Sequence, residues 1–112
     1  EAKAVDYIQF DTNRVGGITQ ARKVAALAEA YSVPVIPHAG QMHNFHVVMA
    51  SLNSPMAEFF PVFDVEIGNE LFWYIFAGEP HPENGYIDLK DDLPGLGLTI
   101  KEDALSNFDV IQ

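Results

Sequence analysis

The first 60 residues alternate short apolar runs with helix-forming segments, and this order limits the possible folds more than any other feature. Residues 5–10, 33–37 and 56–60 are rich in β-branched and aromatic side chains, which favour strands. Between them, residues 18–31 and 42–52 place apolar side chains at helical spacing. A strand–helix–strand–helix–strand order with short connections is typical of a parallel sheet, so we predict an α/β fold.

The second half of the chain does not continue this alternation. Residues 62–77 are rich in aromatic side chains without a clear period, which we interpret as core or as a subunit interface. Turn-forming residues follow, including Asn84-Gly85, and we place a boundary near Gly78. Beyond it, residues 86–92 and 95–100 are expected to form two short strands.

The charge of the chain excludes some classes of partner. The 112 residues include 16 acidic and 6 basic side chains, giving a formal net charge of −10. Nucleic acids and anionic membrane surfaces bind clusters of Lys and Arg, so we expect neither as a partner. No apolar run is long enough to span a membrane, and a cytoplasmic protein is expected. An anionic substrate would need a local attraction, for which a bound cation is the obvious source.

Three ionisable residues lie at the ends of the predicted strands. Asp11 follows the first, His38 the second, and Glu58 lies in the third. Because the carboxyl ends of parallel strands face the same crevice or barrel mouth, these side chains could meet in one pocket. A carboxylate beside a histidine selects its tautomer, and such a histidine can exchange a proton with a substrate. The set therefore predicts a site for proton transfer.

Simpler interpretations of these residues remain open. An Asp such as Asp11 often forms a turn or caps a helix, and His38 could make an ordinary hydrogen bond. Glu58 is harder to explain in this way, because it lies between Ala57 and Phe59 and an unpaired carboxylate in an apolar strand is costly. Glu58 needs a partner.

Further polar residues flank the predicted pocket. His43 and His46 share a helical face, but the paired Glu of a zinc-binding helix is absent, so we do not expect a metal there. His43 is a candidate substrate contact, whereas His46 is expected to pack or to hydrogen-bond along the helix. Arg14 follows the first strand as a candidate substrate-binding residue, and a solvated loop is the alternative.

Four motifs occur in an order that resembles a known family. FDTNRVGGIT, VPVIPHAGQ, MAEFF and LPGLGL resemble the C-terminal third of the enolase superfamily, in its mandelate racemase subgroup. The resemblance implies that residues 1–77 form the last three strands of a (β/α)7β TIM-like barrel. It implies that residues 78–112 return to an α+β capping domain. The remaining N-terminal part of the same polypeptide would complete both domains, and homo-oligomers are usual in the family.

The resemblance also implies an activity. The aromatic segment after Glu58 is most similar to acid-sugar dehydratases of the L-rhamnonate type, which use Mg²⁺ to convert a sugar acid into a 2-keto-3-deoxy acid. It assigns proton transfer to His38, orientation of His38 to Asp11, and a hydrogen bond to a substrate oxygen to Glu58. Arg14 corresponds to a basic position in the family. The Mg²⁺ ligands are expected upstream, and none is expected in this chain.

Two other functions are compatible with these residues. A racemase or epimerase of a 2-hydroxy acid could use the same scaffold, but it would need a second base on the opposite face of the substrate. A non-catalytic fragment or assembly module could keep the scaffold alone. Loss of the upstream metal carboxylates would favour this last alternative.

Overall fold

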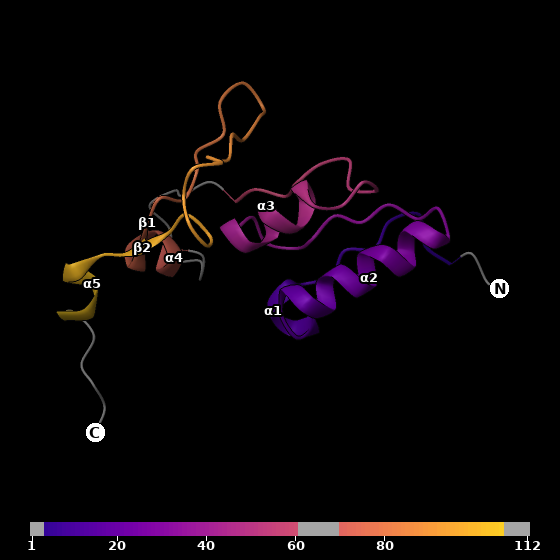
Figure 1. The fold of residues 1–112 in the computed structure, drawn as a ribbon, viewed down its shortest axis with the longest axis horizontal. Coiled ribbons are helices and arrows are strands. Elements are labelled where there is room, and N and C mark those ends of the chain that lie inside the picture. Colours follow the sequence, from indigo (N-terminus) through magenta and orange to yellow (C-terminus); the bar gives the residue numbers. More distant parts are fainter. Residues whose placement is uncertain (1–3, 61–69, 107–112) are drawn as a thin grey trace. The chain divides into compact units, whose positions relative to one another are not determined.

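The computed structural model describes residues 4–60 and 70–106 (Figure 1). The chain divides into two compact units, Glu1–Phe60 and Pro61–Gln112, which are treated separately below. The boundary that we expect near Gly78 separates a predicted barrel part from a predicted cap part. A division into compact units does not test this assignment, which stays a prediction.

Two extended segments of the first unit, residues 7–11 and 33–38, run side by side in the same direction. Ile8 and Val35 form a parallel bridge. Backbone hydrogen bonds of 2.8–3.0 Å join the amides of Ile8, Ile36 and His38 to the carbonyls of Pro34, Ile8 and Phe10. The parallel direction predicted for the first two strands is confirmed, although the pairing is limited to this short bridge.

The third predicted strand, residues 56–60, is extended but is not part of a ladder. The Val35 amide donates to the carbonyl of Asn53 at 3.0 Å, and the Ser54 hydroxyl donates to the carbonyl of Val35 at 2.7 Å. Along the segment 33–38, the next backbone position that would face residues 56–60 after Val35 is Pro37. Proline has no N–H, so the ladder does not continue there. A regular strand over residues 56–60 was therefore a wrong prediction, although Glu58 and Phe59 do lie beside residues 38–40.

Residues 4–60 of the first unit form three helices. The short helix α1, Thr12–Val15, was not anticipated and begins directly after Asp11. The long helix α2, Ile18–Ala30, agrees with the prediction, and α3, Met42–Met49, ends three residues before the predicted residue 52. Gly16, with a φ of 108°, separates α1 from α2 in a left-handed conformation that suits glycine.

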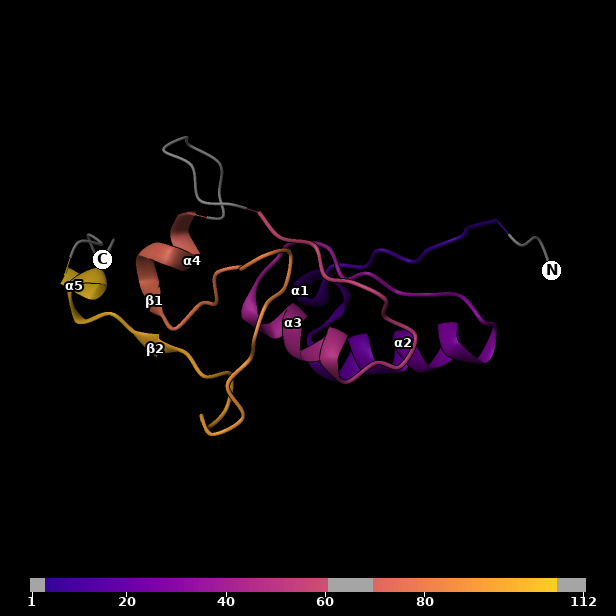
Figure 2. The same ribbon diagram turned by 90° about the horizontal axis from the view of Figure 1, so that it is seen from above.

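The core of the first unit lies between α2 and the extended segments. Ala25, Ala28 and Val35 are buried, and their small side chains allow the helix to approach the backbone closely. In both views, the extended segments run along one side of α2 (Figures 1 and 2). Partly buried apolar residues complete this core: Ile8, Phe10 and Val33.

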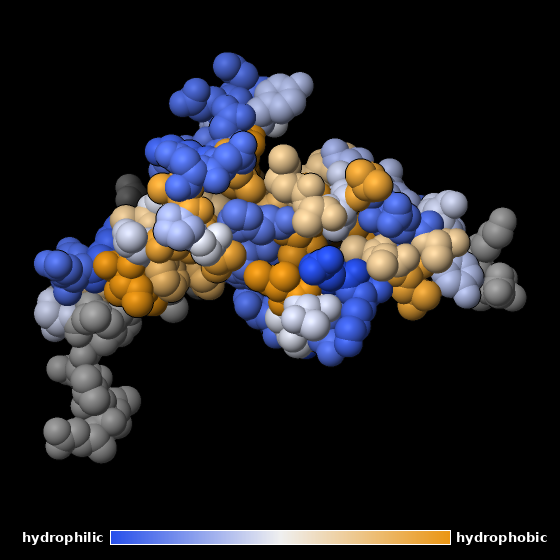
Figure 3. Space-filling view, viewed as in Figure 1, coloured by the Kyte–Doolittle hydropathy of each residue, from blue (hydrophilic) through white to orange (hydrophobic). Residues whose placement is uncertain are grey.

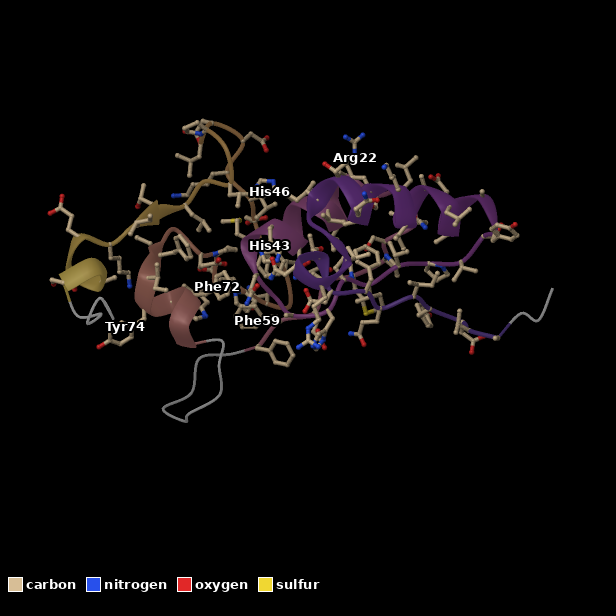
Figure 4. The ribbon with its side chains drawn as sticks, turned by 90° about the horizontal axis from the view of Figure 1, so that it is seen from below. Arg22, His43, His46, Phe59, Phe72 and Tyr74 are labelled. Carbon is tan, nitrogen blue, oxygen red and sulfur yellow. The ribbon has the colours of Figure 1, made fainter. Side chains whose placement is uncertain are left out.

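Apolar side chains also remain on the surface of the first unit. Orange apolar atoms are visible among the blue polar ones (Figure 3). Leu27 on α2 is 63% exposed, and Leu52 after α3 is 96% exposed. Arg22 points outward from α2 (Figure 4). The helix thus buries Ala21, Ala25 and Ala28 on one face and leaves larger side chains such as Leu27 outside.

The second unit is built from short elements. Helix α4, Glu70–Ile75, leads into β1, Phe76–Ala77, and β2, Thr99–Ile100, precedes α5, Glu102–Ser106. The two strands pair antiparallel, with Phe76 opposite Ile100. The Lys101 ammonium donates to the carbonyl of Trp73 at 2.6 Å and so ties the segment after β2 to α4.

Some predictions for the second half are corrected by the structure. Residues 86–92 form no strand, and within residues 95–100 only the last two are in β2, which pairs with β1 instead. The predicted Asn84-Gly85 turn is confirmed, because both residues have positive φ values, 52° and 84°, between bridge partners Glu83 and Tyr86. The aromatic segment 62–77 lies partly outside the described residues.

No helix in the part of the chain that the structure describes is both long and apolar enough to cross a bilayer. The expected cytoplasmic location stays a prediction.

Candidate active site

Two of the predicted site residues, Asp11 and His38, line one open pocket of about 620 Å³ in the first unit. The pocket lies at the carboxyl ends of the two parallel segments, and Glu58 is not among its lining residues. The remaining lining residues are Gln9, Arg14 and Val15. Arg14, a predicted substrate-binding residue, therefore shares the pocket with both of them.

The His38 imidazole is paired with the Glu58 carboxylate. The distance from His38 Nδ1 to Glu58 Oε2 is 2.8 Å, and the amide of Ala39 donates to the same oxygen at 2.6 Å. The edge of the His38 ring meets the Phe60 ring, with 5.9 Å between ring centroids. A carboxylate at Nδ1 favours a proton on that nitrogen, so Nε2 carries the lone pair that can accept a proton from a substrate.

The two side chains of the His38–Glu58 pair differ in their exposure to solvent. The side chain of His38 is 49% exposed and that of Glu58 is 26% exposed. The imidazole is therefore reachable from solvent, while the carboxylate behind it is better shielded. Glu58 has the partner that its apolar neighbours required, and that partner lies 20 residues earlier in the sequence.

The Asp11 carboxylate has a different role in this chain. One oxygen caps α1, accepting hydrogen bonds from the amides of Asn13 at 2.8 Å and Arg14 at 3.2 Å. The other oxygen lies 3.5 Å from Arg14 Nε. The helix-cap alternative therefore describes Asp11 as observed, and His38 is paired with Glu58. An orienting role for Asp11 toward His38 stays a prediction.

Arg14 is the most accessible charged group of the pocket. Its side chain is 89% exposed, whereas that of Asp11 is 19% exposed. An ion pair with such an exposed guanidinium contributes little to stability. The guanidinium can therefore exchange Asp11 for an incoming carboxylate with small loss, which suits a residue that binds an anion.

His43 lies in the first turn of α3 and is half-buried. Burial lowers the pKa of His43 below its ordinary value, and the nearby negative charge of Asp11 partly opposes this effect. His43 therefore favours its neutral form. Figure 4 shows His43 and His46 on the same helix. Contact of His43 with a substrate stays a prediction, because the lining of the pocket does not include it.

Two further residues shape the site and were not singled out from the sequence. Asn44 is buried and donates from its amide to the carbonyls of His38 and Ala39. A Cβ on Gly40 would lie 2.4 Å from the Glu58 carbonyl oxygen, so the two backbones can approach this closely only at a glycine. In the sequence, Asn44 is the one side-chain amide among the apolar residues of the predicted helix, and this could have identified it.

Comparison with known families matches residues 1–104 to the enolase C-terminal domain-like family. The chain belongs to this family. The match covers almost the whole chain and includes all the candidate site residues. It agrees with the resemblance of the sequence motifs to the enolase superfamily.

The chain is also similar to individual proteins of known name or structure. An L-rhamnonate dehydratase homologue of Caldivirga maquilingensis is 39% identical over 106 residues, which are 94% of this chain and 26% of that protein. The crystal structure of rhamnonate dehydratase from Gibberella zeae complexed with Mg is 37% identical, with a TM-score of 0.72, and the match covers 91% of this chain and 26% of that one. An enolase from Pantoea ananatis, with bound D-gluconate and Mg, is 30% identical, with a TM-score of 0.76, over 95% of this chain and 26% of that one.

The enolase-family chain thus spans about a quarter of the length of these relatives. It shares their α/β fold over this region. Its place in a TIM-like barrel, and the return of residues 78–112 to a cap, stay predictions.

Proposed function

We propose that this chain supplies proton-transfer residues to an acid-sugar dehydratase of the enolase superfamily, formed with the remaining N-terminal part of the same polypeptide. The observation that carries the proposal is the His38–Glu58 pair, whose His38 lines a pocket together with Arg14. The names and ligands of the relatives support sugar acids as the substrate class.

The proposed reaction begins at the carbon next to the substrate carboxylate. His38 Nε2 accepts the proton from C2, and the C–H electron pair forms an enediolate. His38 then returns the proton to the departing 3-hydroxyl, which leaves as water. The resulting enol tautomerises to the 2-keto-3-deoxy acid, so the net change is loss of one water molecule.

The neighbouring residues fit this sequence of proton transfers. Glu58 holds Nδ1 and stabilises the imidazolium that forms when Nε2 takes the proton. Arg14 offers a planar guanidinium for the substrate carboxylate, which a chain of net charge −10 does not otherwise attract. Asp11 positions Arg14 through the ion pair and the start of α1.

Magnesium would supply charge stabilisation to the enediolate, but the residues that the structure describes do not form its site. No three His, Asp or Glu side chains within residues 4–60 and 70–106 gather as ligands for a metal ion. Both carboxylates at the site already have partners. Asp11 caps α1 and pairs with Arg14. Glu58 pairs with His38 and accepts a hydrogen bond from the Ala39 amide. We therefore propose Mg²⁺ ligands in the upstream part of the polypeptide and assign none among the described residues of this chain.

The test is an assay of the complete polypeptide with L-rhamnonate and D-gluconate in the presence of Mg²⁺. Formation of the 2-keto-3-deoxy acid is expected, and His38→Asn should lower kcat by about 10²–10⁴-fold. His46→Asn is the matched control, because it makes the same change on α3 outside the pocket lining. Equal activity of both variants would remove His38 from the mechanism.

Turnover in deuterated water separates dehydration from the racemase or epimerase alternative. A dehydratase releases water and forms a keto acid. A racemase or epimerase incorporates deuterium at C2 and keeps the 3-hydroxyl, which proton NMR of the sugar acid detects. Activity of neither kind on these two sugar acids would contradict the proposal in its present form.

A further inference from the structure

The turn after the second extended segment has an unusual backbone. Ala39, directly after His38, has a φ of 68°, a left-handed conformation that non-glycine residues rarely adopt. Such a conformation persists only where surrounding contacts hold it. The contacts at this turn therefore fix the backbone directly after His38.

Asn44 on α3 supplies two of these contacts from a buried position. Its side chain is 2% exposed, and its Nδ2 donates to the His38 carbonyl at 2.8 Å and to the Ala39 carbonyl. Two consecutive carbonyls converge on one amide group. This geometry fixes the orientation of the amide, because only the NH₂ side can face both acceptors.

The opposite side of the same turn is held by the third extended segment. The Ala39 amide donates to Glu58 Oε2 at 2.6 Å, the oxygen that also pairs with His38. Gly40 lies so close to the backbone of residues 58–59 that no Cβ fits there. The turn is thus held between Asn44 on one side and Glu58 on the other.

We propose that Asn44 is a positioning residue, whose buried amide holds the His38–Ala39 turn in its left-handed conformation and thereby keeps the His38 imidazole against the Glu58 carboxylate. Asn44 does not touch the substrate in this proposal and acts through the backbone of His38. The inference rests on the proposed role of His38 in proton transfer. It adds a residue of α3 that neither the strand ends nor the pocket lining indicates.

Asn53 offers a matched control in the same unit. Its Nδ2 also donates to two carbonyls, those of Ala25 at 3.2 Å and Val33 at 3.0 Å. It lies at the opposite end of the second extended segment from His38. Replacing Asn53 removes a comparable pair of hydrogen bonds without affecting the turn at residues 38–40.

The experiment compares Asn44→Ala and Asn53→Ala in the complete polypeptide, with L-rhamnonate and D-gluconate deuterated at C2 as probes. Asn44→Ala should lower kcat by about a hundredfold while KM changes little, because misplacement of a reacting group affects the chemical step. The deuterium isotope effect on kcat should increase in the same variant. Amide hydrogen exchange of residues 38–40 should become faster. Asn53→Ala should show none of these changes.

A second variant, Asn44→Leu, keeps about the volume of the side chain and removes both N–H donors without placing a charge against the two carbonyls, in case the alanine variant does not fold. Unchanged exchange at residues 38–40 in the folded Asn44 variant, or equal kcat losses for Asn44 and Asn53 variants, would overturn the inference. Absence of turnover by the wild-type protein would instead count against the proposed function. Hydrogen exchange alone then decides whether Asn44 holds the turn.

Discussion

The two ends of the extended segment 33–38 differ in chemistry, although an asparagine binds backbone carbonyls at each. The carboxyl end opens into the pocket of about 620 Å³ that contains Asp11, Arg14 and His38. The amino end borders a second pocket of about 430 Å³, whose lining mixes apolar and proline side chains with polar ones. The residues lining this second pocket are Glu29, Ser32, Val33, Pro34, Leu52, Asn53 and Pro55.

The two ends share a structural feature but differ in their ionisable groups. Asn44 at one end and Asn53 at the other make the same kind of double hydrogen bond to the backbone. Only the carboxyl end places an imidazole, a carboxylate and a guanidinium together, because those residues follow the parallel segments in the chain. Changes at the carboxyl end should therefore alter turnover, and changes at the amino end should alter stability alone.

The largest effect is expected for Glu58→Gln. The variant keeps the size of the side chain but removes the charge that stabilises the His38 imidazolium, so kcat of the complete polypeptide should fall by about 10²–10⁴-fold. Steady-state kinetics with L-rhamnonate and D-gluconate measure this effect. A turnover rate within twofold of wild type would show that the His38–Glu58 pair has no part in the reaction.

Gly40→Ala should affect both turnover and stability. The added Cβ would lie 2.4 Å from the Glu58 carbonyl oxygen and 2.5 Å from the Phe59 Cα, so the backbone of residues 58–59 must move. Overpacking of this kind typically costs about 1–3 kcal/mol, and the movement separates Glu58 from His38. Urea unfolding and kcat provide the two measurements. Wild-type values in both would contradict the close approach of the two backbones.

Asn53→Ala should reduce stability while leaving kcat unchanged. The variant loses hydrogen bonds that join α2 to the amino end of the segment, for a cost of about 1 kcal/mol per bond. The free energy of unfolding from urea titration measures the loss, and a parallel activity assay provides the comparison with the carboxyl end. A large fall in kcat with little change in stability would contradict the separation of the two ends.

The half-buried His43 predicts a dependence of stability on pH. Burial lowers its pKa, so the unfolded chain takes up a proton at a higher pH than the folded chain does. The stability contribution of neutral His43 is fully present above its ordinary pKa of 6.5 and is lost as the pH falls from there through the lowered value. Urea unfolding at pH 7.5 and 5.5 tests this loss, which His43→Gln should reduce. An equal pH dependence in the variant would assign it to other groups.

The smallest effect is expected for Leu52, which lines the pocket at the amino end. Leu52 is 96% exposed, so Leu52→Ser removes almost no buried surface from the first unit. A change within about 0.5 kcal/mol in this unit is expected on that ground. A much larger loss of stability in the complete polypeptide would show that another part of the protein covers Leu52.

The prediction from sequence succeeded where local rules apply. Helix α2 follows from the spacing of Ala21, Ala25 and Ala28, and the Asn84-Gly85 turn follows from the positive φ values that these residues tolerate. The prediction failed over residues 56–60 and 86–92, which have the composition of strands but do not pair with a neighbouring strand in a regular ladder. Pro37 removes a donor on the edge that faces residues 56–60, and β2 pairs with β1 rather than with residues 86–92.

For the candidate site, the sequence by itself determined which chemical groups follow the parallel segments, because chain order and strand direction place Asp11 and His38 at the same end. The tertiary structure alone decided which groups pair. His38 pairs with Glu58, 20 residues away, and Asn44 holds the turn between them. The His38–Glu58 contact also needs the close approach of two backbones at Gly40, a distance that packing in three dimensions sets and that no local pattern encodes.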